Sequence, residues 1–387
     1  MIGAGIFFVW APASAAAGTG LLFGLLIAAV VATLNALSTA QLAIAYPVSG
    51  GAYAYGRANV GPWTGFAAGW LFLAGKSASA GAIALIAGSY VMQEHTKLVA
   101  VLIVVVLAGV NASGIRNTAL IASVVVCIVL AGLAAVLVDS LATSSLHPVP
   151  LNGGAGWYGV LQSAGLLFFT FAGYARMATL GEEVRNPRRT LPRAILIALG
   201  ATLVIYAIVG VVCVSVLGTA ALAHSAAPVA DLVTGPMDTI VRIIATIACL
   251  GSLAAVLAGL SRTGLAMARE RDLPGPLSRI SPRTNAPVVA ELVLAAVVIV
   301  GILVLDPAKL IGFSSCSVLA YYAIAHVSAL RQAAVDRWLP RPIQVIGLFG
   351  CGALALTLPW QSILAAVAVL LVGFALRAVG QRARSDR

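Results

Sequence analysis

Glycines interrupt two apolar runs of this sequence, at points where an exposed backbone could bind a charged ligand. Gly3 and Gly5 stand one residue apart in the first run, and Gly173 follows the aromatic pair Phe168 and Phe169 in the sixth. Each glycine weakens a helix by about 1 kcal/mol relative to alanine, so the chain can unwind at these positions. Free N–H groups at the start of the remaining half-helix can then hold a carboxylate. The alternative interpretation is close packing of helices through small residues.

Two basic residues, Lys76 and Arg176, lie inside apolar runs. A charged side chain at membrane depth is costly, so such a residue usually faces an interior cavity or a partner. Lys76 has no carboxylate at a similar depth and must either hydrogen-bond or release its proton, which makes it a candidate coupling group for proton-driven transport. A structural role is the alternative for both residues: Lys76 bonded to helix carbonyls, and Arg176 extended toward the surface or paired near Glu183.

The histidines and cysteines show no arrangement that suits a metal site, a redox pair or a nucleophilic catalyst. They have no metal-ligand or redox spacing, and no Ser/His/Asp set converges by spacing. The residues concerned are His95, His147, His224, His326, Cys127, Cys213, Cys249, Cys316 and Cys351. The sequence therefore predicts no metal, no cofactor and no enzymatic activity.

The composition indicates a membrane protein. Of the 387 residues, 61% are hydrophobic and 9% are charged, and the mean hydropathy is +1.04. An ordinary soluble domain is about 45–50% apolar and about 25% charged, so a soluble enzyme, a disordered chain and a coiled coil are excluded. The apolar runs approach the roughly 20 residues with which a helix crosses a bilayer. They predict an all-α membrane protein with spans at 1–17, 20–43, 62–91, 97–112, 118–138, 157–180, 191–217, 237–268, 287–305, 308–330, 343–358 and 360–377.

Basic residues divide unequally between the two sides of these predicted spans. If the N-terminus is cytoplasmic, 18 of the 23 Lys and Arg residues fall on the inner side and three on the outer side, while Lys76 and Arg176 lie within spans. Positive charges favour the cytoplasmic side, so we expect a protein of the cell membrane, in contact with lipid, with a cytoplasmic C-terminus. The net charge of +11 then reflects topology, and no nucleic-acid partner is expected.

The two glycine-interrupted spans are the first and the sixth, which are five spans apart. Inverted-repeat transporters have two sets of helices in opposite orientations, with broken helices that bind the substrate near the bilayer midplane. This spacing predicts a single polytopic domain, 1–387, with inverted five-helix repeats at 1–139 and 157–330. Two further helices at 341–377 and a cytoplasmic tail at 378–387 complete it.

Several motifs in order resemble the amino acid–polyamine–organocation (APC) superfamily of permeases, which have the LeuT-type fold. The resemblance runs from residue 1 to about residue 290. Gly-Ala-Gly-Ile-Phe at 3–7 resembles the first-helix motif of that family, and Tyr-Pro-Val-Ser-Gly-Gly-Ala-Tyr at 46–53 resembles its first inner loop. The resemblance to the family's sixth helix and its following loop lies in residues 169–174, 181–187 and 192–195. The resemblance to the end of its eighth helix lies in residues 261–262 and 267–274.

This resemblance implies an α-amino acid substrate held by backbone groups of the two broken helices. Helix ends of opposite polarity can hold a zwitterion without ionised side chains. The residues implied are Gly3, Ala4, Gly5 and Ile6 for the carboxylate; Phe168, Phe169, Ala172 and Gly173 for the ammonium, with Phe169 as an aromatic gate; and Lys76, Tyr174 and Arg176 for coupling or gating. Lys76 could also stand where a sodium ion sits in sodium-driven relatives.

The Gly-x-Gly motif departs from the family pattern, because it begins at residue 3 and not in the middle of the first helix. We therefore expect eleven full spans and a first span without its inner half, through a misassigned start codon or a genuine truncation. That half-helix helps to seal the cytoplasmic side in the family. Its loss would impair transport while leaving the fold largely intact.

The function expected from these features is secondary active transport of amino acids by alternating access, either coupled to protons or run as exchange. Neutral substrates are favoured, because Lys76 and Arg176 are positive and a cationic side chain would need a carboxylate beside the site. The alternatives are a polyamine or cationic amino acid exchanger, and a non-transporting receptor or truncated product on the same scaffold. The sequence leaves the oligomeric state open.

Overall fold

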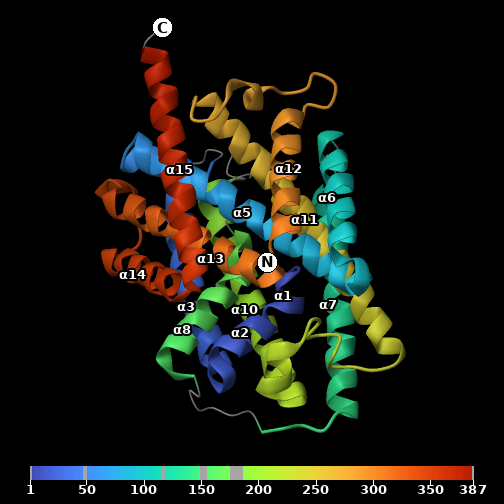
Figure 1. Cartoon of the computed structure of the whole chain (residues 1–387). Helices are drawn as coiled ribbons and strands as arrows, with labels where there is room; N and C mark the ends of the chain where they lie inside the picture. Colours follow the sequence, from blue (N-terminus) through green and yellow to red (C-terminus); the bar gives the residue numbers. More distant parts are fainter. Residues whose placement is uncertain (1, 47–49, 115–117, 149–154, 175–185, 386–387) are drawn as a thin grey trace.

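The computed structural model describes residues 2–46, 50–114, 118–148, 155–174 and 186–385, and within these ranges the regular elements are helices (Figure 1). The α-helices are α1 (Gly5–Phe8), α2 (Trp10–Ala17), α3 (Leu21–Ala45), α4 (Ala52–Asn59), α5 (Pro62–Val91), α6 (Thr96–Ala112), α7 (Thr118–Thr143), α8 (Gly156–Phe171), α10 (Pro187–His224), α11 (Pro236–Arg269), α12 (Val288–Val304), α13 (Pro307–Arg331), α14 (Arg341–Thr357) and α15 (Trp360–Ser385). The 3-10 helices are η1 (Gly18–Gly20), η2 (Gln93–His95), η3 (Ala172–Tyr174), η4 (Gly275–Ser278) and η5 (Ala334–Asp336).

Each apolar run of the sequence forms a helix, which confirms an all-α membrane protein. Eight helical stretches of the described chain are long and apolar enough to cross a membrane, with α2 and α3 counted as one, and α12 and α14 are shorter apolar helices of 17 residues each. Proline stands in the first turn of several helices. A backbone N–H at that position has no intrahelical acceptor, so proline, which has no N–H, loses no hydrogen bond there. Examples are Pro62, Pro236 and Pro307.

The structure differs from the predicted spans in several places; for example, α15 continues to Ser385, whereas the predicted span ends at 377. The polar break after the second span contains the short helix α4, which the hydropathy pattern does not indicate. The sixth span is predicted to run to residue 180, but α8 ends at Phe171 and η3 follows it; residues 175–185 lie outside the described ranges. The seventh span continues past its predicted end at 217, because α10 resumes after Gly218, whose φ of 70° interrupts the helix.

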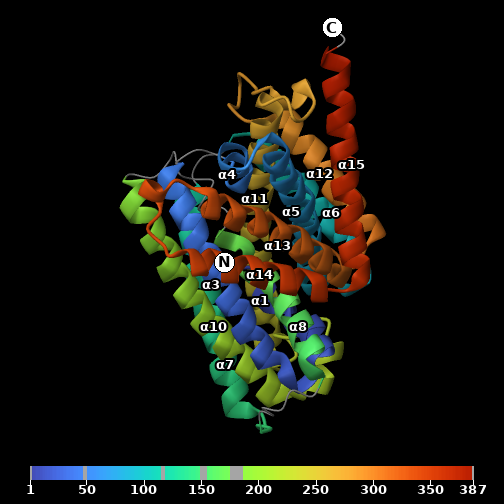
Figure 2. The same cartoon turned by 90° about the vertical axis from the view of Figure 1, so that its left-hand side faces the viewer.

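Helix α5 lies at the centre of the bundle and is buried along most of its length (Figures 1 and 2). Helices α11 and α13 pack against it. Glycine allows close approach to both: a Cβ at Gly69 would lie 2.7 Å from Met267 Sδ on α11, and one at Gly75 would lie 2.8 Å from Ser317 Cβ on α13. Small residues at helix contacts are the usual means by which membrane helices pack. Helices such as α6 and α15 expose leucine and valine on their outer faces, as contact with lipid requires.

The ends of the helices lie at two opposite ends of the bundle. The C-terminal end of α15, the α11–α12 connection and α4 lie at one end, and the C-terminal end of α7 lies at the other (Figures 1 and 2). The first three segments carry many of the arginines that the sequence assigns to the inner side. The N-terminal end of the described chain lies about midway between these two ends.

Candidate functional site

A small cavity forms where the start of α1 meets α5, the end of α8, η3 and α11. Its volume is about 80 Å3. It brings together segments that are far apart in the sequence, and most of them are helix ends or glycine-containing turns. Its lining residues are Ile2, Gly3, Ala4, Gly5, Lys76, Ser79, Ile83, Phe169, Thr170, Gly173, Ser252 and Val256. Gly3, Ala4, Gly5, Lys76, Phe169 and Gly173 are among the residues singled out by the sequence.

The glycines of α1 permit close contact with two other helices. A Cβ at Gly5 would lie 2.8 Å from Thr170 Cγ2, and one at Gly3 would lie 2.9 Å from Ser252 Cβ and Oγ. The N–H of Ala4 lies 3.5 Å from Ser252 Oγ and donates weakly to it. The start of α1 is therefore held against both α8 and α11, so its glycines serve packing as well as any exposure of the backbone.

The residues after Gly5 turn away from the cavity and fix the irregular helix start. Ile6 and Phe7 are fully buried. The Ile6 N–H donates to the carbonyl of Gly3 at 3.3 Å. The Ile6 carbonyl accepts from Trp10 Nε1 at 2.7 Å, and the Phe7 carbonyl accepts from the Tyr90 hydroxyl at 2.8 Å. These side-chain bonds satisfy backbone carbonyls at the break, which buried backbone groups require.

The end of α8 supplies the opposite wall of the cavity. Phe169 lines it, whereas the side chain of Phe168 points elsewhere and packs edge-on against Tyr322 with ring centroids 5.9 Å apart. The carbonyl of Ala172, in η3, accepts a hydrogen bond from Lys76 Nζ at 3.1 Å. The side chain of Tyr174 and all of Arg176 lie outside the described residues.

Lys76 is the one charged side chain among the described residues that line the cavity. The residue is 8% exposed, and the part of the lining that the structure describes holds neither aspartate nor glutamate. A buried ammonium needs acceptors to offset its lost hydration, and the carbonyl of Ala172 supplies one. Lys76 therefore reaches the end of α8 from the middle of α5.

Sequence reasoning missed three polar residues of the cavity. Ser79 lies one turn after Lys76 and shares a hydrogen bond of 2.6 Å with Ser314 on α13. Its i+3 spacing from Lys76 is the signal that could have found it. Thr170 and Ser252 offer no comparable signal, because hydroxyl residues are common in membrane helices and usually bond their own backbone. Ser252 does so with the carbonyl of Ala248 at 2.7 Å.

A larger cavity of about 410 Å3 lies beside α5, α12 and α13. Its lining is almost entirely apolar: Trp70, Leu73, Ala74, Ser77, Ala78, Gly264, Leu273, Leu277, Val293, Leu294, Val297, Gly301, Leu305, Leu310, Phe313 and Val369. Such a wall offers little to a carboxylate or an ammonium, which must be hydrogen-bonded when they leave water. The smaller cavity is therefore the better candidate for a charged or zwitterionic ligand.

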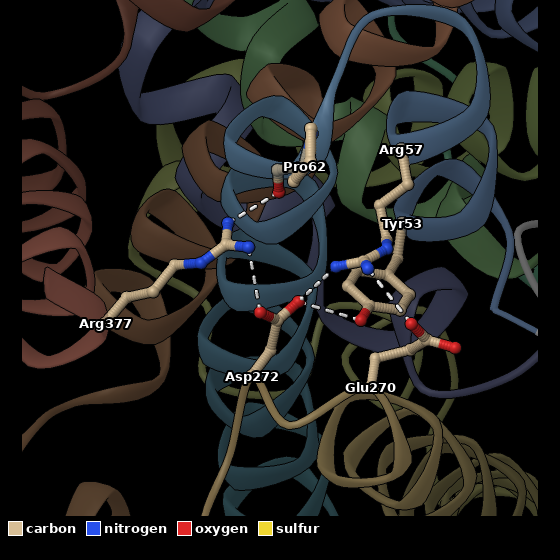
Figure 3. Close-up of polar contacts among 6 residues, drawn as sticks. All are labelled: Tyr53, Arg57, Pro62, Glu270, Asp272 and Arg377. Atoms are coloured by element: carbon tan, nitrogen blue, oxygen red, sulfur yellow. Dashed lines mark hydrogen bonds and ion pairs between the residues drawn. The ribbon is translucent and has the colours of Figure 1, made fainter. Parts of the chain in front are cut away.

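A second group of polar residues, the Asp272 cluster, gathers at the end of the molecule where α4, α5, α11 and α15 meet (Figure 3). Asp272 follows α11, and its carboxylate pairs with Arg57 at 2.9 Å and with Arg377 at 3.0 Å. It also accepts from the Tyr53 hydroxyl at 2.8 Å. Arg57 makes a further pair with Glu270 at 3.0 Å. One carboxylate therefore joins α4 and α15 to the segment that follows α11.

The contacts of this cluster differ in how much they stabilise the protein, because their side chains are buried to different extents. The side chains of Asp272 and Arg377 are each 5% exposed. Arg377 also donates to the carbonyl of Pro62, and its guanidinium stacks on the rings of Trp63 and Phe66. Burial, and then the hydrogen bond to Asp272, raise the pKa of the Tyr53 phenol above its ordinary range, so Tyr53 stays a donor.

Comparison with known proteins decides the family. The family model for amino acid permeases matches residues 1–381. The chain belongs to the amino acid permease family. This confirms the APC resemblance: the permease is a multi-pass membrane transporter and not an enzyme, and the family implies an amino acid substrate.

Three relatives illustrate the range of this similarity. An uncharacterised transporter of Mycobacterium tuberculosis is 50% identical to the permease over 395 residues, which cover 99% of this chain and 90% of the relative. The branched-chain amino acid permease of Bacillus subtilis is 28% identical over 418 residues, covering 96% and 88%. The vacuolar cationic amino acid transporter 4 of Arabidopsis thaliana is 28% identical over 381 residues, covering 88% and 61%.

Proposed function

We propose that the permease is a secondary active transporter that carries neutral amino acids across the cell membrane by alternating access. The observation that carries this proposal is the small cavity between α1, α5, α8 and α11, where the start of α1 and the end of α8 face the middle of α5 and of α11. In this assignment the amino acid carboxylate lies at Gly3, Ala4 and Gly5, and its ammonium lies at the end of α8 near Ala172. Phe169 covers the ligand on one side.

The charge of the cavity supports neutral substrates. The described lining contains one positive side chain, Lys76, and no carboxylate. A lysine or arginine side chain bound here would meet a like charge and would find no ionised partner. The branched-chain permease of Bacillus subtilis agrees with this preference, whereas the cationic transporter of Arabidopsis thaliana favours the alternative of a cationic substrate.

Uptake in proteoliposomes tests the substrate class. We expect unlabelled leucine, valine or alanine to reduce the uptake of radiolabelled leucine, while arginine and a polyamine at the same concentration leave it unchanged. The physical reason is that the described residues around the cavity place no carboxylate beside Lys76. Protein-free liposomes give the background. Strong inhibition by arginine, with none by neutral amino acids, would instead support the cationic alternative.

We further propose that residues 1–139 and 157–330 form two inverted repeats, that 341–377 holds the last two helices, and that the tail at 378–387 is cytoplasmic. The mid-height position of the N-terminal segment and the shared end of α4, the α11–α12 connection and α15 support this arrangement (Figure 2). Superposing the two segments after a two-fold rotation in the membrane plane tests it, because a parallel relation would contradict an inverted repeat.

We propose Lys76 as the residue that couples transport to protons. It is the only titratable side chain among the described residues that line the cavity, and Gly5 lines the same space. Lys76→Met should abolish the pH dependence of uptake while substrate still raises the thermal stability of the variant, because methionine keeps the length of the side chain without a proton to exchange.

The matched control is Lys97→Met. Lys97 also donates to a backbone carbonyl, that of Leu303, at 2.9 Å, but it is exposed on the outer end of α6. We expect this variant to keep the pH profile of the parent. An unchanged pH profile in Lys76→Met, or an absolute requirement for sodium in the parent, would contradict the role of Lys76 in proton coupling.

A further inference from the structure

The bond between Lys76 and Ala172 occupies a position that a substrate ammonium would need. Lys76 Nζ lies 3.1 Å from the carbonyl oxygen of Ala172, and the bond is buried. Ala172 begins η3, directly after α8 ends at Phe171. The last carbonyls of a helix lack intrahelical partners and carry partial negative charge. They are a natural acceptor for any ammonium in this cavity.

The described lining of the cavity has no other negative group of comparable strength. It contains no aspartate or glutamate, and its polar side chains are the hydroxyls of Ser79, Thr170 and Ser252. Thr170 and Ser252 donate their protons to the carbonyls of Leu167 and Ala248, and Ser79 bonds Ser314, so these hydroxyls offer an ammonium only neutral oxygens, without the partial charge of a helix end. A cationic group that enters the cavity is therefore directed to the end of α8.

We propose that the Lys76 ammonium and the ammonium of a bound amino acid compete for the same carbonyl end of α8, so that an amino acid binds fully only when Lys76 leaves Ala172. This inference rests on the proposed function, because it takes an α-amino acid as the ligand. Two ammonium groups at one carbonyl repel each other, and the repulsion is strong where water is scarce. The cavity of about 80 Å3 leaves room for only a handful of water-sized groups between them.

The competition makes Lys76 a specificity-determining residue, because it affects the affinity for ligands with an amino group and for ligands without one in opposite ways. A carboxylic acid that lacks the amino group has no need of the Ala172 carbonyl, and its negative charge is attracted by Lys76. An α-amino acid of the same shape must displace Lys76 first. Removing the lysine should therefore change the affinities for these two ligands in opposite directions.

Matched ligand pairs test this directly. Binding to the purified full chain in lipid nanodiscs is measured by calorimetry at one pH, with leucine against 4-methylpentanoate and with alanine against propionate. The variants are Lys76→Met, which removes both charge and donor, and Lys76→Gln, which removes the charge and keeps a donor toward Ala172. Lys97→Met is the control, since Lys97 makes an equivalent bond to Leu303 at the exposed end of α6.

We expect Lys76→Met to bind the amino acids at least tenfold more tightly than the parent and the deaminated acids at least tenfold more weakly. Lys76→Gln should shift both affinities in the same directions by less, and Lys97→Met should shift neither. Weaker binding of the amino acids by Lys76→Met, or a parallel change for both ligands of a pair, would overturn the competition.

The parent protein alone gives a further test that does not depend on a folded variant. If Lys76 holds the end of α8, the parent should bind 4-methylpentanoate at least as tightly as leucine. A preference of more than tenfold for leucine would contradict the competition while leaving amino acid transport intact. If no amino acid binds any form of the protein, the proposed function is contradicted. The competition is then contradicted as well, because it requires an amino acid as the ligand.

Discussion

Asp272→Asn is expected to lower the free energy of unfolding by about 3–5 kcal/mol, the cost of breaking a buried ion pair by removing one partner. The variant leaves the guanidinium of Arg377, whose side chain is 5% exposed, with a backbone carbonyl and two aromatic rings but no counter-charge. Arg57 keeps Glu270, which is half exposed and screened by water. Thermal or denaturant unfolding in a mild detergent measures the loss.

An exposed ion pair that also contains an aspartate provides the control. Asp306 pairs with Lys309 at 3.0 Å, and the two side chains are 64% and 69% exposed. Asp306→Asn should cost about 1 kcal/mol or less, because water already solvates both charges. The double variant Asp272→Asn/Arg377→Met should lose less than the sum of its two single variants, since each has already broken the shared pair. Equal losses at positions 272 and 306 would contradict the role given to burial.

Gly5→Ala is expected to reduce transport by roughly 10- to 100-fold, as small misplacements at a binding site do. The new methyl group would lie 2.8 Å from Thr170 Cγ2 and 3.1 Å from Thr170 Cβ, so α1 and α8 must move apart. Thr170 cannot easily turn away, because a β-branched side chain in a helix has few rotamers and this one is 5% exposed. Initial rates of leucine uptake, corrected for the amount of protein inserted, measure the effect.

The control and the rescue variant both come from this chain. A Cβ at Gly109 on α6 would meet no atom within 4 Å, so Gly109→Ala should transport normally and gain up to about 1 kcal/mol of helix stability. Thr170→Ser removes the methyl group that lies nearest to the new one. Adding it to Gly5→Ala should recover part of the lost uptake. Parent-like uptake by Gly5→Ala would mean that the close contact of α1 with α8 is not needed for transport.

Hydropathy is sufficient to locate the helices, because a chain in lipid must satisfy its own backbone hydrogen bonds, and an apolar run does so as a helix. The predicted span at 287–305 is α12 (Val288–Val304), and the one at 308–330 is α13 (Pro307–Arg331). Helix α4 is different. Its eight residues have no apolar run, and the N–H of Ala52 donates to the Tyr321 hydroxyl from 269 positions away. Such a helix depends on distant partners that a local pattern does not contain.

The candidate site likewise contains residues that the sequence indicates and residues that only tertiary packing brings into it. Lys76, Gly3 and Gly5 stand out in the sequence because a charge or a glycine pair is anomalous in an apolar run. Ser252 is an ordinary residue for a membrane helix, and it joins the cavity only because α11 packs against the start of α1. Ala172 is named from the sequence only through the family resemblance, because a backbone carbonyl has no signature in residue type. Its importance comes from the place where α8 ends, which depends on tertiary packing.

The Asp272 cluster also has a consequence for how the chain is made. Arg377 is synthesised 105 residues after Asp272, which at about 5–20 residues per second corresponds to roughly 5–20 s of translation. During that interval Asp272 has Arg57 and Tyr53 as partners, and the face of α5 at Trp63 and Phe66 has no guanidinium to cover it. Membrane insertion of α15 then completes a contact that began with α4. This end of the bundle therefore acquires its final packing only after α15 has been synthesised and inserted.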